Sequence, residues 1–396
     1  MDQVVIVGAS LAGVRTAEAL RTGGYTGQLT LIGNEVGAPY DRPPLSKSYL
    51  EGKRTPEQLA LRPADPLLAA LDVSFISGVS AVGLDLERQL VHLDTGASIN
   101  FDGLVIATGT SPRTIAGTQH LLRVHTLRTL QDAAALRQTL QTGANVVVIG
   151  AGFIGAEVAS TAKSAGANVT VVEAAAVPLA RQLGDEMGTA VAALHQRNGV
   201  NLMTGCAVSQ ISETHVHLNA DRQLSYDACV VGVGVSPNTE WLDGNGLDLS
   251  NGVRCDSSLR VMVDGTPHER IVAVGDVAAW VNPRYAYEGP VRVEHWTNAA
   301  ESADHAAATL LGSSTPFSPV PYFWSDQYGR KIQFLGRSAG FEEVVVVHGS
   351  VDDKFVALYR RDNELVGVLG VSSIKTLMQY RQKLIDRCSW ADALSG

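Results

Sequence analysis

Short apolar runs alternate with amphipathic stretches through most of this chain. Runs at residues 4–7, 29–32, 146–149 and 169–172 have the length and composition of buried strands. A glycine-rich turn and a stretch of helical character follow the first and the third of these runs. This order of strand, turn, helix and second strand predicts two parallel α/β units, one at the start of the chain and one in its middle.

From about residue 319 the pattern changes. Short apolar segments at 334–336, 344–348, 354–359 and 365–370 are separated by turn residues, which is typical of an antiparallel sheet. A helix is expected at about 373–386. No glycine-rich turn of the earlier kind occurs here, so we expect a further α+β domain with a different role.

The turn after residue 149 carries the dinucleotide pattern G-x-G-x-x-G at Gly150, Gly152 and Gly155. Glu173 ends the next strand, eighteen residues later. The glycines let the backbone approach a pyrophosphate, and the helix N-terminus supplies N–H groups and a positive dipole. The pattern predicts a dinucleotide site that also includes the helix residues Phe153, Ile154 and Glu157. An ordinary α/β unit with a glycine-rich turn is the alternative.

The first turn repeats this arrangement with one change. Gly8 and Gly13 keep the outer positions, Ser10 replaces the middle glycine, and Glu35 stands twenty-two residues after Gly13. Serine still permits close backbone approach. Two such units predict two different nucleotides, and the economical pair is a tightly held flavin dinucleotide with an exchangeable nicotinamide dinucleotide.

Further candidates lie in a loop and at three strand ends. Arg42 and Lys47 belong to the proline-held loop P-Y-D-R-P-P-L-S-K, where fixed cations could meet a pyrophosphate or a flavin, unless the loop is simply solvated. Strand ends supply Thr108 and Gly109, then Gly234, then Asp276 and Val277. Asp276 suits a polyol or ribose hydroxyl, and a helix-capping role would be compatible with that.

The chain length of 396 residues suits several domains. We expect a fold of two Rossmann-like dinucleotide-binding domains and a C-terminal α+β domain. The expected boundaries are 1–111 and 241–318 for the two parts of an FAD-binding domain, 112–240 for an NAD-binding domain, and 319–396 for the C-terminal domain.

Charge and hydropathy narrow the function classes. A net charge of −9 argues against a nucleic-acid surface. No apolar run approaches the roughly 20 residues of a membrane span. The chain enters a predicted strand at once, which leaves no room for a targeting peptide, so we expect a cytoplasmic protein without membrane contact. Cys206, Cys229, Cys255 and Cys388 form no close pair, so we expect no metal or iron–sulfur centre.

At this point a resemblance is evident. Its most specific blocks are P-Y-D-R-P-P-L-S-K at 39–47 and F-W-S-D-Q at 323–327. Both glycine turns contribute, as do A-T-G at 107–109, G-V-S-P-N-T at 234–239, Gly275-Asp276 and Glu294-His295-Trp296. Over essentially its whole length the chain resembles the NADH-dependent flavoprotein ferredoxin reductases of oxygenase systems, which share the glutathione-reductase-like architecture.

The resemblance implies a role for each candidate. FAD would lie on the first unit, with Gly8, Ser10 and Gly13 at its pyrophosphate and Glu35 at the adenosine ribose. Thr108, Gly109 and Val277 would lie beside it, Arg42 and Lys47 along its pyrophosphate and flavin, and Asp276 at the ribityl chain. NADH would lie on the second unit and on Gly234. Glu173 would accept from the ribose hydroxyls and repel a 2′-phosphate.

Three residues would act at the flavin. In related reductases the equivalents of Lys47 and Glu157 meet near flavin N5, where the lysine stabilises negative charge and the glutamate orders the nicotinamide. Otherwise Glu157 is an acid favoured by the helix dipole. Trp296 would form an aromatic wall against the flavin or nicotinamide, or else belong to the core.

The resemblance also implies a partner. The electron acceptor would be a small acidic ferredoxin with a 2Fe-2S or 3Fe-4S cluster that feeds a haem monooxygenase or a ring-hydroxylating dioxygenase. Docking would need local positive charge, and Trp324 is a candidate interface residue. The candidate cations, unless they are scattered surface charges, are Arg330, Lys331, Arg337, Arg360, Arg361, Lys375, Arg381 and Lys383.

Two alternatives stay open. One is an NADH oxidase or disulfide-type flavin reductase, against which the lack of a cysteine near Ser46 counts. The other is an interaction module like the apoptosis-inducing factors. A basic face or a targeting segment would favour it, and neither is evident.

Overall fold

The computed structural model describes residues 1–61, 69–219 and 221–395. These residues form two compact units, each built from separate stretches of the chain. The first unit comprises Met1–Asp41, Leu59–Ser111 and Ser236–Pro321, and the second comprises Arg42–Gln58, Pro112–Val235 and Tyr322–Gly396.

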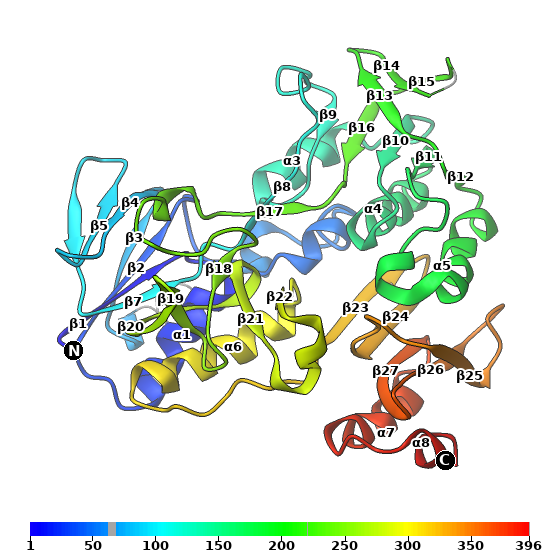
Figure 1. The fold of residues 1–396 in the computed structure, drawn as a ribbon. Coiled ribbons are helices and arrows are strands. Elements are labelled where there is room, and N and C mark those ends of the chain that lie inside the picture. The colour runs from blue at the N-terminus through cyan, green and yellow to red at the C-terminus, as the bar shows by residue number, and fades with distance from the viewer. Residues whose placement is uncertain (62–68, 220, 396) are drawn as a thin grey trace. The chain divides into compact units, whose positions relative to one another are not determined.

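The first unit is built on a six-stranded sheet in the order β19-β20-β7-β1-β2-β3 (Figure 1). Its pairs are parallel except for the edge pair β19–β20. In the pair β1–β2, Val4 lies opposite Leu29, and both are fully buried. The strands are β1 Gln3–Val7, β2 Gln28–Gly33, β3 Val73–Ser77, β7 Gly103–Ile106, β19 Arg260–Val263 and β20 Thr266–Ala273.

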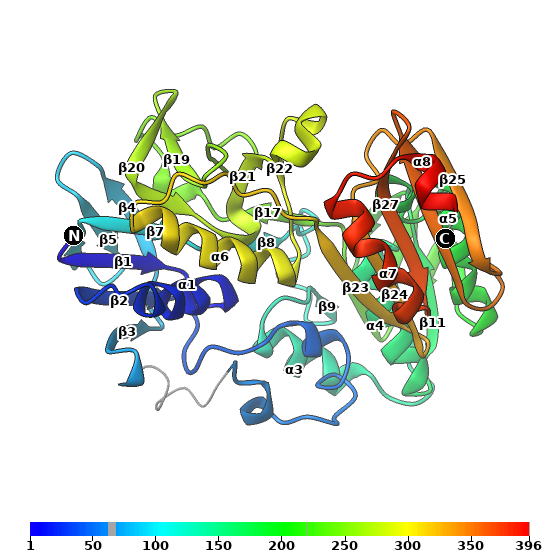
Figure 2. The same ribbon diagram turned by 90° about the horizontal axis from the view of Figure 1, so that it is seen from below.

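Two helices pack together on this sheet because each presents an apolar stripe. They are α1 Leu11–Thr22 and α6 Trp296–Leu310, and they lie side by side (Figure 2). Leu20 and Ala306 are fully buried members of the same core as the central strands. The burial of these stripes places the first turn of α1 next to the strand ends.

Smaller sheets complete the first unit. The strands β4 Ala81–Asp85, β5 Leu90–Leu93 and β6 Ser98–Asn100 form one of them. In the other, β21 pairs with β18 in parallel and with β22 in antiparallel fashion. Its strands are β18 Val253–Arg254, β21 Ala278–Val281 and β22 Pro290–Arg292. Two short strands, β8 Thr110–Pro112 and β17 Val235–Pro237, pair with each other where the chain passes from one unit to the other.

The second unit contains a five-stranded sheet in the order β12-β11-β10-β16-β9, and all of its pairs are parallel. Its strands are β9 Val124–His125, β10 Asn145–Ile149, β11 Asn168–Val172, β12 Asn201–Met203 and β16 Ala228–Val231. The helices are α3 Leu130–Thr139, α4 Phe153–Ser164 and α5 Ala180–Arg197. A hairpin sheet is formed by β13 Val208–Ile211, β14 His215–Leu218 and β15 Gln223–Ser225.

The C-terminal part of this unit is an antiparallel sheet in the order β23-β24-β27-β26-β25. Its strands are β23 Tyr322–Gln327, β24 Arg330–Gly336, β25 Glu343–Gly349, β26 Phe355–Arg361 and β27 Glu364–Val371. Side chains of α5 such as Leu183 pack with Phe355 and Tyr359 of this sheet. Helix α7 Ile374–Ile385 packs on β27 and β24 through residues such as Leu377, and α8 Trp390–Leu394 follows it (Figure 2).

The fold prediction is therefore confirmed: the chain contains two mainly parallel α/β sheets and a C-terminal α+β part with an antiparallel sheet. One strand of the C-terminal sheet, β23, had no sequence signal of its own. Its sequence at 322–327 has three aromatic residues followed by three polar ones, so it lacks the alternation of apolar and polar positions that marks a one-sided strand. No helix in the described ranges is long and apolar enough to cross a membrane.

Candidate functional site

The second glycine turn joins β10 to α4 and has the geometry of a dinucleotide cradle. A Cβ atom on Gly150, whose φ is +96°, would lie 2.3 Å from the carbonyl oxygen of Gly232. A Cβ atom on Gly155 would lie 2.1 Å from the carbonyl oxygen of Gly150. A Cβ atom on Gly152 would meet no atom within 4 Å. The outer glycines therefore fit the turn against protein, whereas the middle glycine leaves space over the helix N-terminus, which fits a bound pyrophosphate.

Glu173 lies directly beside this turn. One of its carboxylate oxygens, Oε2, accepts a hydrogen bond from the backbone N–H of Ala151 at 2.8 Å. The other, Oε1, accepts from the N–H of Ala175 at 2.8 Å. The predicted ribose acceptor is thus held at the carboxyl end of β11 by the same turn that would hold the pyrophosphate.

The first glycine turn joins β1 to α1 and lies against two other strand ends of its own unit. A Cβ atom on Gly8 would lie 2.1 Å from the carbonyl oxygen of Ala107, at the end of β7. The Asp276 carboxylate accepts a hydrogen bond from Thr110 at 3.3 Å. The helical turn Gly275–Val277 therefore meets the residues that follow β7. Since ligands of open α/β sheets bind outside the carboxyl ends of the strands, these three segments form a cradle that fits FAD.

Three residues that had no role in the sequence prediction hold this cradle in place. The Tyr40 hydroxyl donates a hydrogen bond to the Glu35 carboxylate. The side-chain amide of Asn238 donates to the backbone carbonyl oxygen of Thr108 at 2.8 Å, and the backbone carbonyl oxygen of Asn238 accepts from the Thr108 hydroxyl at 2.7 Å. Tyr40 and Asn238 both stand in conspicuous sequence blocks, but no local pattern indicates which residue each one contacts.

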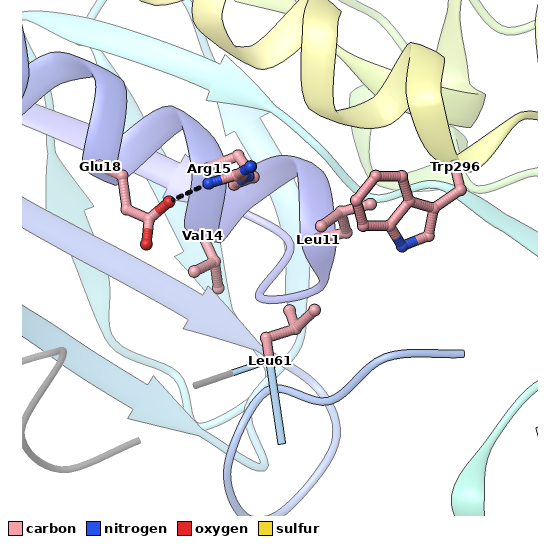
Figure 3. Close-up of a pocket in the computed structure, with 6 residues that line it drawn as sticks. All are labelled: Leu11, Val14, Arg15, Glu18, Leu61 and Trp296. Atoms are coloured by element: carbon pink, nitrogen blue, oxygen red, sulfur yellow. Dashed lines mark hydrogen bonds and ion pairs between the residues drawn. The ribbon is translucent and has the colours of Figure 1, made fainter. Parts of the chain in front are cut away.

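The third of these residues is Asp41, which fixes Trp296. The indole N–H of Trp296 donates to Asp41 Oδ1 at 2.7 Å. Trp296 begins α6, and its ring lies beside Leu11, the first residue of α1 (Figure 3). Both side chains line a cavity of about 160 Å³, together with Val14, Arg15, Glu18 and Leu61. The tryptophan therefore stands next to the turn that begins at Gly8, in the orientation that Asp41 imposes.

Lys47 and Glu157 form an ion pair in the second unit. Lys47 Nζ lies 2.7 Å from Glu157 Oε2, and Glu157 is buried in the first turns of α4. The Ser46 hydroxyl donates to the same oxygen at 2.5 Å. Lys47 follows the helical turn Pro43–Ser46, whose proline pair fixes its local conformation. The sequence prediction that these two residues meet is thus matched by a direct contact between residues 110 positions apart.

Other candidates are placed as follows. Arg42 donates to the carbonyl oxygen of Arg128 at 2.6 Å, and both residues belong to the second unit. The Phe153 ring packs on Phe323 with centroids 4.7 Å apart, whereas Ile154 is exposed. Gly234, with φ at +99°, accepts at its carbonyl oxygen from the N–H of Arg113 at 2.9 Å.

The cysteines have the character of structural thiols. All four are free, and burial raises the pKa of Cys229 to about 12. The pKa of Cys255 is also raised by burial. Since the thiolate is the reactive form, neither is poised for redox chemistry. Among the residues that the structure describes, no cluster of His, Cys, Asp or Glu could hold a metal ion.

Comparison with known proteins agrees with this geometry. The family model for pyridine nucleotide-disulphide oxidoreductases matches residues 2–303, and the reductase C-terminal model matches residues 322–394. Rhodocoxin reductase from Rhodococcus erythropolis is 39% identical over 388 residues, which cover 96% of this chain and 89% of that protein.

Two solved structures have the same fold throughout. The reductase in the covalent putidaredoxin reductase–putidaredoxin complex is 34% identical, with a TM-score of 0.91 and coverage of 98% of this chain and 93% of that chain. The ferredoxin reductase for the CYP199A2 system from Rhodopseudomonas palustris is 35% identical, with a TM-score of 0.92 and coverage of 100% and 97%. The chain belongs to the pyridine nucleotide-disulphide oxidoreductase family, among its ferredoxin–NAD(P)⁺ reductases.

Proposed function

We propose that this protein is an NADH-dependent ferredoxin reductase with FAD as its prosthetic group. Its electron acceptor is a small acidic iron–sulfur ferredoxin with a 2Fe-2S or 3Fe-4S cluster, which serves a haem monooxygenase or a ring-hydroxylating dioxygenase. In this proposal residues 1–111 and 241–318 bind FAD, residues 112–240 bind NADH, and residues 319–396 form the C-terminal interface domain.

The observation that carries the proposal is the ion pair between Lys47 and the buried Glu157, on the helix that follows the second glycine turn. A cradle for a nucleotide supports binding only. A lysine paired with a buried carboxylate beside it supplies a positive charge and a positioned acceptor, and hydride transfer to a bound flavin would need both.

The protein's own groups have distinct tasks. The helix N-termini after Gly8 and Gly150 bind the two pyrophosphates. Glu173 accepts from the adenosine ribose of NADH and excludes a 2′-phosphate by charge repulsion. With both cofactors bound, Glu157 would order the nicotinamide, Lys47 would stabilise negative charge on the flavin, and Trp296 would form an aromatic wall against the flavin or nicotinamide. When bound, FAD supplies the conversion from two-electron to one-electron transfer.

Relatives support the choice of acceptor. One neighbouring structure is a covalent complex of putidaredoxin reductase with putidaredoxin, and another relative is named as the reductase component of a p-cumate 2,3-dioxygenase system. The thiol chemistry of a disulfide-type reductase has no support here, because Ser46 and not a cysteine contacts Glu157 and burial raises the pKa of Cys229. Four unpaired cysteines also favour a reducing compartment, and we place the protein in the cytoplasm.

The test is an anaerobic stopped-flow titration of the purified flavoprotein with NADH, followed at the flavin absorbance. Ferredoxins with 2Fe-2S and with 3Fe-4S clusters are added in a second mix. We expect fast bleaching by NADH and reoxidation by one of the ferredoxins. Rapid reoxidation by oxygen but by neither ferredoxin would favour the oxidase function, and a lack of bleaching would reject the activity altogether.

A further inference from the structure

One face of α4 is polar, although the helix lies in the core of its unit. Glu157, Ser160 and Thr161 stand three and four residues apart and so share that face. The Thr161 hydroxyl donates to the carbonyl oxygen of Ser46 at 2.8 Å. The Ser160 hydroxyl oxygen accepts from the N–H of Tyr328 at 2.7 Å, in the turn that follows β23. The helix is thus tied both to the segment that carries Lys47 and to the C-terminal sheet.

Glu157 lies between these two attachments and receives four hydrogen bonds. Its Oε2 accepts from the Ser46 hydroxyl at 2.5 Å and from Lys47 Nζ at 2.7 Å. Its Oε1 accepts from the Ser325 hydroxyl at 2.7 Å and from the backbone N–H of Asp326 at 3.2 Å. One oxygen is therefore held by the Lys47 segment and the other by strand β23.

The direction of the Ser325 hydrogen bond follows from the chemistry of its neighbours. A carboxylate without a proton can only accept, so the Ser325 hydroxyl must donate to Glu157. The lone pairs of the hydroxyl oxygen then face Gln327, whose Nε2 donates to it at 3.1 Å. Ser325 and Gln327 are both fully buried on the same face of β23. The hydroxyl hydrogen of Ser325 has a single available direction.

We propose that Ser325 is a positioning residue for hydride transfer and that it acts through Glu157. This inference rests on the proposed role of Glu157 in ordering the nicotinamide. Lys47 reaches Glu157 from a flexible four-carbon stem, so that contact alone leaves the carboxylate plane free to rotate. The contacts from Ser325 and Asp326 come from β23, the edge strand that pairs with β24 along its whole length, and they fix the second oxygen. The C-terminal sheet would thereby be a part of the hydride-transfer site.

Three variants separate positioning from general packing. Ser325→Ala removes the hydroxyl from Oε1, and Ser46→Ala removes the other serine contact from Oε2. Ser160→Ala is the matched control, because it removes a buried hydroxyl that joins the same helix to the same hairpin but does not contact Glu157. All three are studied as FAD-loaded enzymes.

The first measurement is the limiting rate of flavin bleaching by NADH in anaerobic stopped flow, together with the NADH concentration at half-saturation. We expect Ser325→Ala to lower the limiting rate about tenfold, because small misplacements of a positioning group cost rate more than binding. We expect Ser160→Ala to keep the wild-type rate. Equal slowing by both variants would show that the contact acts only through packing and would overturn the proposal.

The second measurement does not depend on turnover. Apparent melting temperatures of the holoenzyme are compared for Ser325→Ala, Glu157→Gln and the double variant. Because the two groups share one hydrogen bond, we expect the shift of the double variant to be smaller than the sum of the single shifts. Additive shifts would show that the groups are not coupled and would overturn the proposal.

The role of Glu157 itself is tested separately. If Glu157→Gln transfers hydride as fast as the wild type, the proposed role of the Lys47–Glu157 pair fails and the positioning role of Ser325 fails with it. If Glu157→Gln is slow while Ser325→Ala is not, only the role of Ser325 fails. In a Glu157→Gln background, Ser325→Ala should cause no further slowing.

Discussion

Carboxylates held by backbone or hydroxyl donors are the recurring device at the scale of single residues. Glu173 accepts from two backbone N–H groups, Glu35 from the Tyr40 hydroxyl, and Glu157 from four donors. Such contacts fix the acceptor oxygens before a ligand arrives, which lowers the cost of binding. They also make each carboxylate depend on residues elsewhere in the chain.

Replacement of Glu173 should change the coenzyme preference. We expect Glu173→Ala to narrow the NADH-over-NADPH preference by at least about tenfold, since hydrogen bonds to a charged group contribute about 1.5–3 kcal/mol. The measurement is kcat/KM with each coenzyme. Asp227→Ala is the control, because Asp227 accepts from the N–H of Asn145 at the other end of β10. An equal preference in the two variants would place the ribose elsewhere.

His195 should make the protein sensitive to acid. It is buried on α5, where its Nδ1 lies 2.7 Å from the Tyr328 hydroxyl, and burial lowers its pKa from 6.5 to about 4. Between pH 6.5 and 4, His195 is therefore protonated in the unfolded chain and neutral in the folded chain. The contribution to stability is therefore complete above pH 6.5 and is lost as the pH falls towards 4, which amounts to roughly 3 kcal/mol.

Chemical unfolding of the wild type and of His195→Gln at about pH 7.5, 6, 5 and 4 measures this loss, because these values span the His195 pKa of the unfolded and of the folded chain. We expect the stability of the wild type to fall more steeply than that of the variant over this window. Parallel curves would assign the acid sensitivity to other groups.

At the scale of elements, the strand–turn–helix unit is the part whose geometry decides binding. Gly155 lets α4 approach the end of β10 and Gly150 lets the turn pack against Gly232, while the middle glycine faces open space. The same residue type therefore serves packing at one position and ligand access at another. A pair of alanine variants can separate the two effects.

Gly155→Ala should destabilise the fold, because its Cβ atom would lie 2.1 Å from the carbonyl oxygen of Gly150. Overpacking of this kind costs about 1–3 kcal/mol. Gly152→Ala should fold normally, since its φ of −71° suits alanine and its Cβ atom meets no protein atom. We expect this second variant to lose NADH affinity instead. Melting temperatures and NADH titrations check both expectations, and a Gly152→Ala protein with unchanged affinity would contradict the cradle.

At the scale of the whole molecule, charge bears on partner choice. The chain carries a net charge of −9, so an acidic ferredoxin needs a local cationic surface. Several candidate cations already pair with carboxylates of the chain: Arg330 with Asp353, Lys331 with Asp326, Arg360 with Glu342 and Glu343, and Arg361 with Asp362. Lys375 and Arg381 are exposed on α7.

A charge-matched comparison tests which cations attract the ferredoxin. We expect the double variant Lys375→Gln/Arg381→Gln to slow ferredoxin reduction several-fold at low ionic strength and to leave flavin bleaching by NADH unchanged. The control is Arg330→Gln/Lys331→Gln, which alters the net charge equally but removes cations that carboxylates already neutralise in part. The difference should vanish at about 1 M salt, where screening is strong. Equal effects of the two double variants would mean that only net charge matters.

Much of the fold could be predicted because its signals are local. The two glycine turns, their flanking strands and the acids that follow them lie within about thirty residues, which is the span of one βαβ unit. The C-terminal sheet was predicted from four of its five strands. The fifth strand, β23, gave no clear signal because its three aromatic residues are followed by three polar ones. The small sheets β4–β6 and β13–β15 gave none because their strands are three to five residues long and their pairing depends on neighbours that the sequence does not name.

The sequence by itself determined the family, the two nucleotide cradles and the identity of most candidate site residues, since backbone geometry there depends on the residue types at fixed spacings. Only the tertiary structure decided which groups hold the catalytic candidates. Ser325 and Glu157 are 168 residues apart, and Trp296 and Asp41 are 255 apart. Such contacts arise when packed elements bring distant side chains together, and no local pattern encodes that distance.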